Sequence, residues 1–128
     1  MEQTLDQTRA AYLLARVKKQ VKSQEYRRRV EQLPSMILTN GLGQTLAFLL
    51  SDSNDHAALA VATDLAEYLT AQRKLYRKDN EQLTSVDLLE SIVGGDRDML
   101  QRATDESLSL LTWWKKLVRA YIPKQKGA

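Results

Sequence analysis

Apolar residues recur at steps of three and four along most of the chain, which is the spacing of one face of an α-helix. The longest stretch without charge, LPSMILTNGLGQTLAFLL, runs from Leu33 to Leu50 and keeps this spacing on both sides of two glycines. A short helix this apolar is marginal alone in water, so it is predicted to lie in the middle of a packed core. Pro34 suits the first turn of such a helix, where its missing N–H would have had no partner.

Gly41 and Gly43 interrupt this central stretch. Each costs a helix interior about 1 kcal/mol relative to Ala. The helix therefore either bends here, or another helix or subunit comes so close that a side chain would not fit. We favour the close approach, so Gly41→Leu is expected to damage folding or assembly. A glycine loop that cradles a ligand is the weaker alternative, because the segment lacks the Lys and the preceding strand of a phosphate loop.

A helix is predicted before the central stretch, over residues 5–32, which contain no Gly or Pro and are rich in helix formers. One apolar stripe runs along it as far as Val21 and then meets Gln24 and Arg28, so the helix is expected to bend or leave the core there. Tyr12 and Tyr26 lie on a second face. They are expected to border the core with their hydroxyls in water, and the alternative is that this face touches a partner.

Capping and breaking residues divide the rest of the chain into three further helices. The first follows the turn Ser51–Asp55, and its basic last turn, Arg73 to Lys78, suits the helix dipole. A polar connector is predicted at residues 78–82. Thr84 then caps a short helix that stops at Gly94 and Gly95. Asp96 caps a long last helix, which ends near Ile122 because Pro123 cannot continue it.

No segment alternates with period two for long enough to form a strand. The predicted fold is therefore all-α, a compact single-domain bundle of about five helices over residues 1–128 with a frayed tail at about 123–128. The 128 residues are 43% hydrophobic and 27% charged and include no cysteine, which favours a cytoplasmic protein without disulfides or thiolate metal sites. The chain has neither a run of about 18 apolar residues nor a signal peptide, so no membrane partner is predicted.

The charge is distributed unevenly, although the net charge is only +3. Residues 1–31 hold eight Lys and Arg against four acids, and residues 113–128 hold five against none. Such segregation favours a polyanionic partner, because ammonium and guanidinium groups displace the counterions of a phosphate backbone. Lys18, Lys22 and Arg29 are predicted to share one helical face. The alternative is a merely solvated basic face. The candidate nucleic-acid-binding residues are Lys18, Lys19, Lys22, Arg27, Arg29, Lys115, Lys116 and Arg119.

No catalytic or metal constellation emerges from the sequence. His56 is the only histidine, and a metal site with Asp52 and Asp55 would place three ligands in one turn without the second element that such sites use. Asp105 and Glu106 are adjacent on a helix, so they point about 100° apart and cannot face one substrate bond. Glu106 lies one turn from Arg102, and a partly buried ion pair or a bond to a neighbouring helix end explains it better than acid–base catalysis. We predict no enzyme activity, no cofactor and no small-molecule substrate.

Three segments together resemble the small subunit of the type III-B CRISPR (Cmr) interference complex. They are YRRR at Tyr26–Arg29, LPSMILTNGLGQTLAFL at Leu33–Leu49, and ATDESLSLLTWWKKLVRA at Ala103–Ala120. Their order and spacing agree with the family, and the motif around the glycines is long and unusual. The pair Trp113 and Trp114 departs from the family pattern, which usually reads Trp then Leu, and the departure should affect packing more than role.

This resemblance implies a non-catalytic α-helical subunit of an antiviral ribonucleoprotein. Its implied partners are other Cmr subunits, copies of itself, and the guide and target RNA duplex or the target backbone, held through phosphates. The rival hypothesis is a protein-only adaptor whose basic faces meet acidic partner surfaces, and a hydrolase using Asp105 or Glu106 is a weaker one. The residues expected to serve structure or assembly are Tyr26, Pro34, Gly41, Gly43, Trp113 and Trp114.

Overall fold

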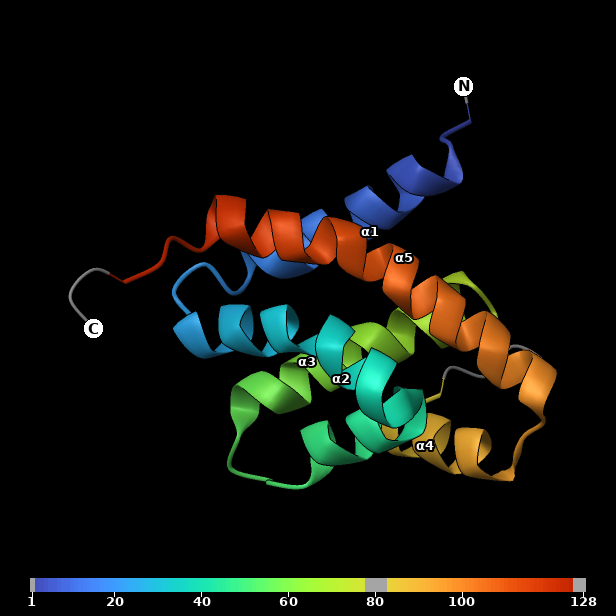
Figure 1. Cartoon of the computed structure of the whole chain (residues 1–128). Helices are drawn as coiled ribbons and strands as arrows, with labels where there is room; N and C mark the ends of the chain where they lie inside the picture. The colour runs from blue at the N-terminus through green and yellow to red at the C-terminus, as the bar shows by residue number, and fades with distance from the viewer. Residues whose placement is uncertain (1, 78–82, 126–128) are drawn as a thin grey trace.

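A computed structural model of the chain describes residues 2–77 and 83–125. Every regular element in this part of the chain is a helix, so the predicted all-α fold is confirmed (Figure 1). A short π-helix, η1, directly follows α3. The elements are α1 (Leu5–Lys18), α2 (Gln24–Leu50), α3 (His56–Glu67), η1 (Tyr68–Gln72), α4 (Ser85–Gly94) and α5 (Arg97–Tyr121).

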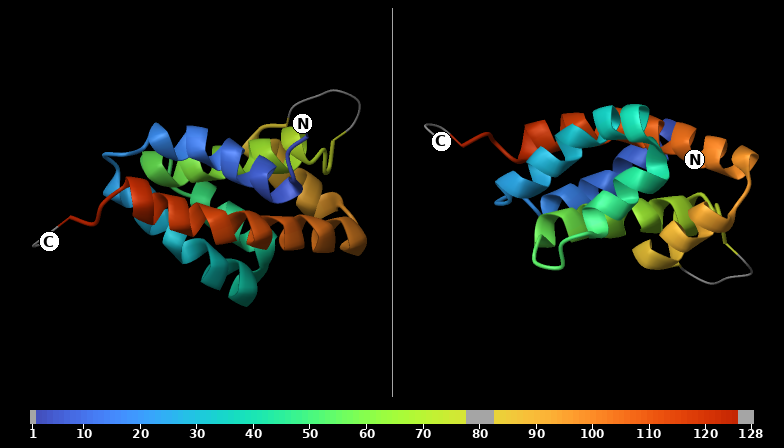
Figure 2. Two further views of the ribbon diagram at one scale, coloured as in Figure 1. Left: turned by 90° about the horizontal axis from the view of Figure 1, so that it is seen from above. Right: turned by 60° about the horizontal axis from the view of Figure 1, so that its bottom comes forward.

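The two helices α1 and α5 lie side by side, as Figure 2 shows from above. The first half of α2 packs against α5, and α3 packs against α2. The short helix α4 closes the end of the bundle that lies away from the C-terminus. The apolar faces of all five helices meet in one buried cluster.

A polar network lies inside this cluster and joins three helices. Tyr26 of α2 is fully buried, and its hydroxyl donates to Asp64 Oδ2 of α3 at 2.7 Å. The indole Nε1 of Trp114 in α5 donates to the same hydroxyl at 3.2 Å. Burial raises the pKa of Asp64, against the hydrogen bond from Tyr26.

The two tyrosines do not border the core with their hydroxyls in water, so that prediction was wrong. The hydroxyl of Tyr26 is satisfied by the buried carboxylate of Asp64. The hydroxyl of Tyr12 donates to the backbone carbonyl of Asp64 at 2.6 Å. Both tyrosines therefore fasten their helices to the same residue of α3.

The structure corrects the first predicted helix, which is two helices. α1 ends at Lys18, and α2 begins at Gln24 after a tight turn. The Ser23 side chain caps α2 by accepting from the backbone N–H of Tyr26 at 3.0 Å. Val21 in the turn is 41% exposed. The chain therefore reverses where the apolar stripe runs out, although no Gly or Pro marks the site.

The sequence predicted that the central stretch begins its own helix at Pro34, and this prediction was wrong. The stretch continues α2, and Pro34 lies inside that helix, well beyond the first turn. Because proline has no N–H, the carbonyl of Val30 loses its usual helical donor there. By length and composition alone, the helix α2 is long and apolar enough to cross a membrane. Its buried face packs against α3 and α5, which is the arrangement of a core helix.

The two glycines of α2 have different roles. Gly41 adopts φ 86° and ψ 162°, which breaks α2 into two helical halves, and a Cβ added there would meet nothing within 4 Å. Gly41 is therefore a bend, and the predicted close approach of another helix of this chain was wrong there. The predicted approach of a neighbouring subunit at Gly41 stays a prediction. The close approach occurs at Gly43, where an added Cβ would lie 3.2 Å from Ile92 Cγ2 of α4.

We expect Gly41→Ala to lower the free energy of unfolding by about 1–3 kcal/mol, because this backbone region is essentially closed to residues with a Cβ. The larger Gly41→Leu should cost at least as much. Urea denaturation of the variant and the wild type measures the effect. Gly94→Ala is the matched control, since Gly94 lies in α4 with open space around it. Equal free energies for the two variants would contradict the assigned bend.

Three predicted helix ends are confirmed. Thr84 caps α4 in a reciprocal capping box with Asp87. The Asp96 side chain caps α5 by accepting from Met99 N at 2.8 Å, and α5 ends at Tyr121, two residues before Pro123. These ends were predictable because each depends on side chains within three residues of the helix terminus.

The prediction that the helix after Asp55 ends in a basic last turn, Arg73 to Lys78, was wrong. The chain widens into η1 and leaves the helix at Arg73, and Lys74 and Tyr76 then adopt positive φ values of 58° and 62°. This path carries Leu75 into the core. Lys78 and the predicted polar connector at 78–82 lie outside the described residues.

Candidate nucleic-acid interface

The turn between α1 and α2 lies beside the C-terminal end of α5, as both views of Figure 2 show. Gln24 fixes this contact, since its Nε2 donates to the Pro123 carbonyl at 2.6 Å and its Oε1 accepts from Gln125 N at 3.2 Å. Arg27 Nη1 also donates to the Ile122 carbonyl at 2.7 Å. Two hydrogen bonds therefore tie Pro123 and Gln125 to α2, residues 126–128 lie outside the described part, and the fraying of residues 123–128 stays a prediction.

This contact gathers basic side chains from two distant parts of the sequence, and we call the region the basic end. Lys18 reaches over the ring of Tyr121, with Nζ 6.0 Å from the ring centroid. Lys19 and Lys22 are exposed in the turn. The residues of the basic end are Lys18, Lys19, Lys22, Arg27, Arg28, Lys115, Lys116, Arg119 and Lys124.

Two carboxylates stand among these cations, and both are already paired. Glu31 Oε1 accepts from Arg119 Nε at 2.9 Å and from Arg27 Nε at 3.3 Å. The hydrogen bonds from Arg119 and then Arg27 hold the pKa of Glu31 below its ordinary value. Glu25 pairs with Arg28 one turn away. The field of the basic end is therefore positive, because its lysines outnumber what these two acids neutralise.

Arg29 does not belong to the basic end, which corrects the predicted face of Lys18, Lys22 and Arg29. Its Nη2 donates to Asp55 Oδ2 at 2.6 Å, and its guanidinium carbon lies 5.5 Å from the centroid of the Phe48 ring. The hydrogen bond from Ala58 N, and then the one from Arg29, lower the pKa of Asp55. Arg29 therefore fastens the start of α3 to α2. The predicted face is not formed because α1 ends at Lys18.

Arg27 is only partly available, since its side chain is 16% exposed and is held by Glu31 and the Ile122 carbonyl. Arg119 is 55% exposed, and its contact to Glu31 uses Nε. Of the remaining predicted residues, Lys116 is exposed on α5 and Lys115 is half-buried. Arg28 and Lys124 also lie at the basic end, but they were not among the residues predicted from the sequence. The signal for Lys124 was its place in the acid-free segment 113–128.

A groove of about 320 Å³ runs between the first half of α2 and the C-terminal half of α5. We call it the α2–α5 groove. Apolar side chains form its floor and the cations Lys115, Lys116 and Arg119 form its rim. A second hollow, of about 550 Å³, continues past Arg119 to Arg28 and Lys124. The residues that line the α2–α5 groove are Pro34, Leu108, Leu111, Thr112, Lys115, Lys116 and Arg119.

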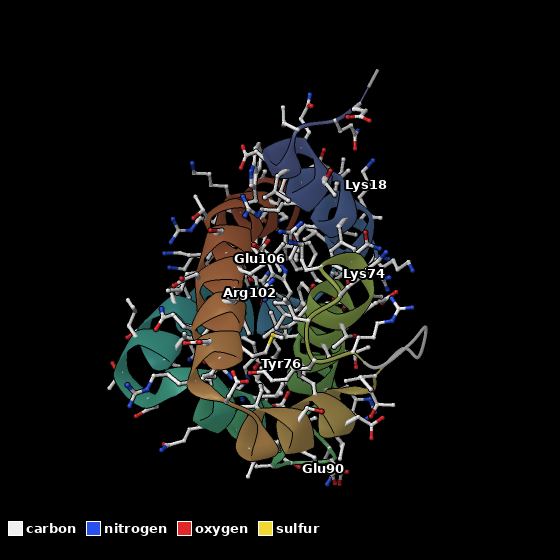
Figure 3. All side chains as sticks on the ribbon, turned by 90° about the vertical axis from the view of Figure 1, so that its right-hand side faces the viewer. Lys18, Lys74, Tyr76, Glu90, Arg102 and Glu106 are labelled. Carbon is white, nitrogen blue, oxygen red and sulfur yellow. The ribbon has the colours of Figure 1, made fainter. Side chains whose placement is uncertain are left out.

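The far half of α5 carries Glu106, which lies between α5, α1 and the segment after η1 (Figure 3). Its carboxylate accepts from Arg9 Nε and Nη2 at 3.0 and 3.1 Å and from the Tyr68 hydroxyl at 2.6 Å. Arg73 Nε lies 3.3 Å away. The neighbouring Asp105 is exposed and accepts from Gln101. The predicted partly buried ion pair is confirmed, with Arg9 as the partner. Asp105 and Glu106 both line one hollow of about 340 Å³, so the expectation that they cannot share a site is not met.

Glu106→Gln is expected to lower the free energy of unfolding at pH 7 by about 3 kcal/mol, because it removes the bidentate counter-charge of the half-buried Arg9 and leaves it only the exposed Asp6 at 3.9 Å. Burial alone would raise the pKa of Glu106, but the hydrogen bonds from Arg9 and Tyr68 and the charge of Arg73 hold it below the ordinary value. The ionised form therefore stabilises the fold above the unfolded pKa of about 4.3. That contribution is lost as the pH falls through the lower, folded pKa.

Urea denaturation at pH 7 and near pH 3 tests this, and the difference between wild type and Glu106→Gln should shrink at the lower pH. Asp105→Asn is the control, with an expected change within about 0.5 kcal/mol for an exposed site. A difference that grows toward acid pH would contradict the lowered pKa.

The turn before α3 provides no metal site in the structure. His56 is exposed, and both oxygens of Asp55 are engaged, Oδ1 by Ala58 N and Oδ2 by Arg29. Asp52 accepts from Asn54 N. Over residues 2–77 and 83–125, no group of three or more His, Cys, Asp or Glu side chains could hold a metal ion.

Comparisons with known proteins show the family and support the fold. The family model described as "CRISPR-associated protein (Cas_Cmr5)" matches residues 5–121. A solved structure of a CRISPR-associated Cmr5 family protein from Thermus thermophilus superimposes with a TM-score of 0.75 and 27% sequence identity. The match covers 94% of this chain and 99% of the Thermus chain. No curated protein sequence matches.

Proposed function

The chain belongs to the Cmr5 family of CRISPR-associated proteins, the small subunits of the type III-B Cmr complex, and we propose that it serves there as a non-catalytic subunit that holds RNA by its phosphate backbone. The RNA lies at the basic end in this proposal, and other subunits carry out any cleavage. Its proposed RNA ligand is the target strand, alone or paired with the guide. The proposed compartment is the cytoplasm.

The observation that carries this proposal is the basic end itself. Two segments about a hundred residues apart, the α1–α2 turn and the end of α5, bring their cations together. Lys19, Lys22, Lys116 and Lys124 are exposed there. Phosphates bound by such side chains release their counterions, a gain that does not depend on base sequence.

Protein partners have a different surface available. Val86 and Val93 of α4 are 51% and 79% exposed, and Leu38 of α2 is 73% exposed. The helix α4 lies at the opposite end of the bundle from the basic end. We propose that other Cmr subunits and copies of this chain meet these apolar side chains, so that protein and RNA contacts do not compete for one face.

The salt dependence of RNA binding tests the proposal and separates it from the protein-only adaptor. Affinity for single-stranded and duplex RNA should be measured for the isolated chain and for the assembled complex over a series of salt concentrations. We expect log affinity to fall linearly with log salt, with a slope set by the number of phosphates contacted. Absence of any contribution of this subunit to RNA affinity, even at low salt in the complex, would leave the adaptor as the better explanation.

A further inference from the structure

The α2–α5 groove has an apolar floor that phosphate binding does not need. Pro34 and Leu108 are half-buried on this floor, and Leu111 is buried beneath them. A phosphate backbone presents only charge and sugar, so an apolar floor below a cationic rim would give it no added contact. A ligand that matches both parts carries a flat apolar body next to an anionic group.

We propose that the α2–α5 groove takes one unpaired nucleotide of the bound RNA, with its base on the floor and its phosphates on the rim. This inference rests on the proposed function and deepens it, because it specifies the state of the RNA at this site. A volume of about 320 Å³ is at the small end of the range for ligand pockets, so it suits a single base. Bases in a duplex are stacked and paired, and they cannot reach such a floor.

The rim positions the phosphates on either side of the base. Lys115, Lys116 and Arg119 follow one another at one and three residues along α5, so they lie along one edge of the groove. Arg119 is oriented by its contact to Glu31, while more than half of its side chain stays exposed. The lysines contribute mobile point charges, and the arginine contributes a planar group whose orientation its contact to Glu31 sets.

Thr112 adds a hydrogen-bonding group at the edge of the floor. Its hydroxyl donates to the Leu108 carbonyl at 3.2 Å, so the oxygen keeps its acceptor capacity toward the groove. A base amine or a ribose 2′-hydroxyl can donate to it. The floor, the rim and this acceptor together describe a nucleotide site with little preference among bases.

The test compares three RNA probes on the full-length chain. The probes are a single-stranded oligouridine, an RNA duplex with the same number of phosphates, and a single strand with an abasic ribose-phosphate backbone. Wild type should bind oligouridine more tightly than either of the other two. Leu108→Gln should lower the oligouridine affinity about five- to tenfold, the size of one lost base contact. Its affinity for the abasic strand and its salt slope should stay unchanged.

Pro34→Ala is the second variant and guards against a folding defect. It removes the ring from the floor but restores an N–H for the Val30 carbonyl, so the helix should be no less stable. It should show the same selective loss of oligouridine affinity. Leu100→Gln is the matched control, because Leu100 is a half-buried leucine of α5 at the end away from the basic end, and it should bind all three probes as wild type does.

Equal binding of the three probes with a steep salt slope, unaffected by Leu108→Gln, would overturn the nucleotide site and leave phosphate binding intact. No binding of any probe at low salt would remove the proposed function and this inference with it. If Leu108→Gln instead lowers incorporation into the Cmr complex and leaves RNA affinity unchanged, the groove is a protein interface and the inference is wrong.

Discussion

Replacing Lys115 and Lys116 by Glu is expected to lower RNA affinity about a hundredfold or more at physiological salt, while the chain stays folded. Neither side chain has an ion-pair partner among the described residues, so their reversal breaks no ion pair there. Glu is also a good helix former. Each reversal removes one phosphate contact and adds a repulsion, and the log–log salt slope should fall by about 0.7 per lost contact on a single strand.

Fluorescence anisotropy with labelled RNA measures both the affinity and the slope, and a thermal melt confirms the fold. The matched control reverses Lys74 and Arg97, which are exposed away from the basic end, and so changes the net charge by the same amount. An equal loss in the two double variants would show that net charge rather than the basic end attracts the RNA. An unchanged affinity for Lys115→Glu/Lys116→Glu would place the RNA on another face.

Trp114→Ala is expected to have the largest effect on stability, about 3–5 kcal/mol, the range for removing a large aromatic side chain from a core. Trp114 is fully buried, and its ring centroid lies 6.4 Å from that of Tyr26. The variant also removes the indole donor to the Tyr26 hydroxyl. A loss of this size is a large fraction of the free energy of unfolding of a typical small domain. The variant should therefore also assemble poorly into the complex.

The neighbouring Trp113 is the control, because it is half-buried at the edge of the same core. We expect Trp113→Ala to cost clearly less, about 1–2 kcal/mol. Urea denaturation of both variants measures which of them loses more free energy of unfolding. A larger loss for Trp113→Ala would contradict the placement of α5 against α2, since the two residues point in different directions on that helix.

The sequence predicted those parts of the fold whose causes are local. The caps at Thr84 and Asp96 and the stop before Pro123 depend on groups within a few residues, and all three were found. Beyond Val21 the sequence predicted a bend or an exit from the core, but not the complete break between α1 and α2, because neither Gly nor Pro marks it. It becomes intelligible only in the folded chain, where Ser23 caps α2 and Tyr26 reaches Asp64 across the core.

The sequence predicted the kind of site, a basic surface for a polyanion, but not all of the residues that form it. The acid-poor ends of the chain indicated a polyanionic partner, and most of the predicted basic residues do lie at the basic end. Arg29 does not, because its partner Asp55 is 26 residues away, and helical periodicity alone cannot reveal such a pair. The role of Pro34 in the groove floor was likewise hidden, since the groove exists only between α2 and α5.

The resemblance to the Cmr small subunits supplied the family and membership of the Cmr complex, and the comparisons confirm both. It supplied no contact between this chain and RNA. That part of the proposal depends on how the bundle positions the α1–α2 turn beside α5. The contacts of Gln24 with Pro123 and Gln125 are therefore as important to the proposed function as the lysines themselves.

The most direct test is cross-linking of 4-thiouridine-labelled target RNA in the assembled Cmr complex, with the modified residues of this subunit identified by mass spectrometry. Cross-links are expected in peptides from the α1–α2 turn and from residues 112–125. Cross-links confined to α4 or to the N-terminal half of α5 would contradict the assignment of RNA binding to the basic end.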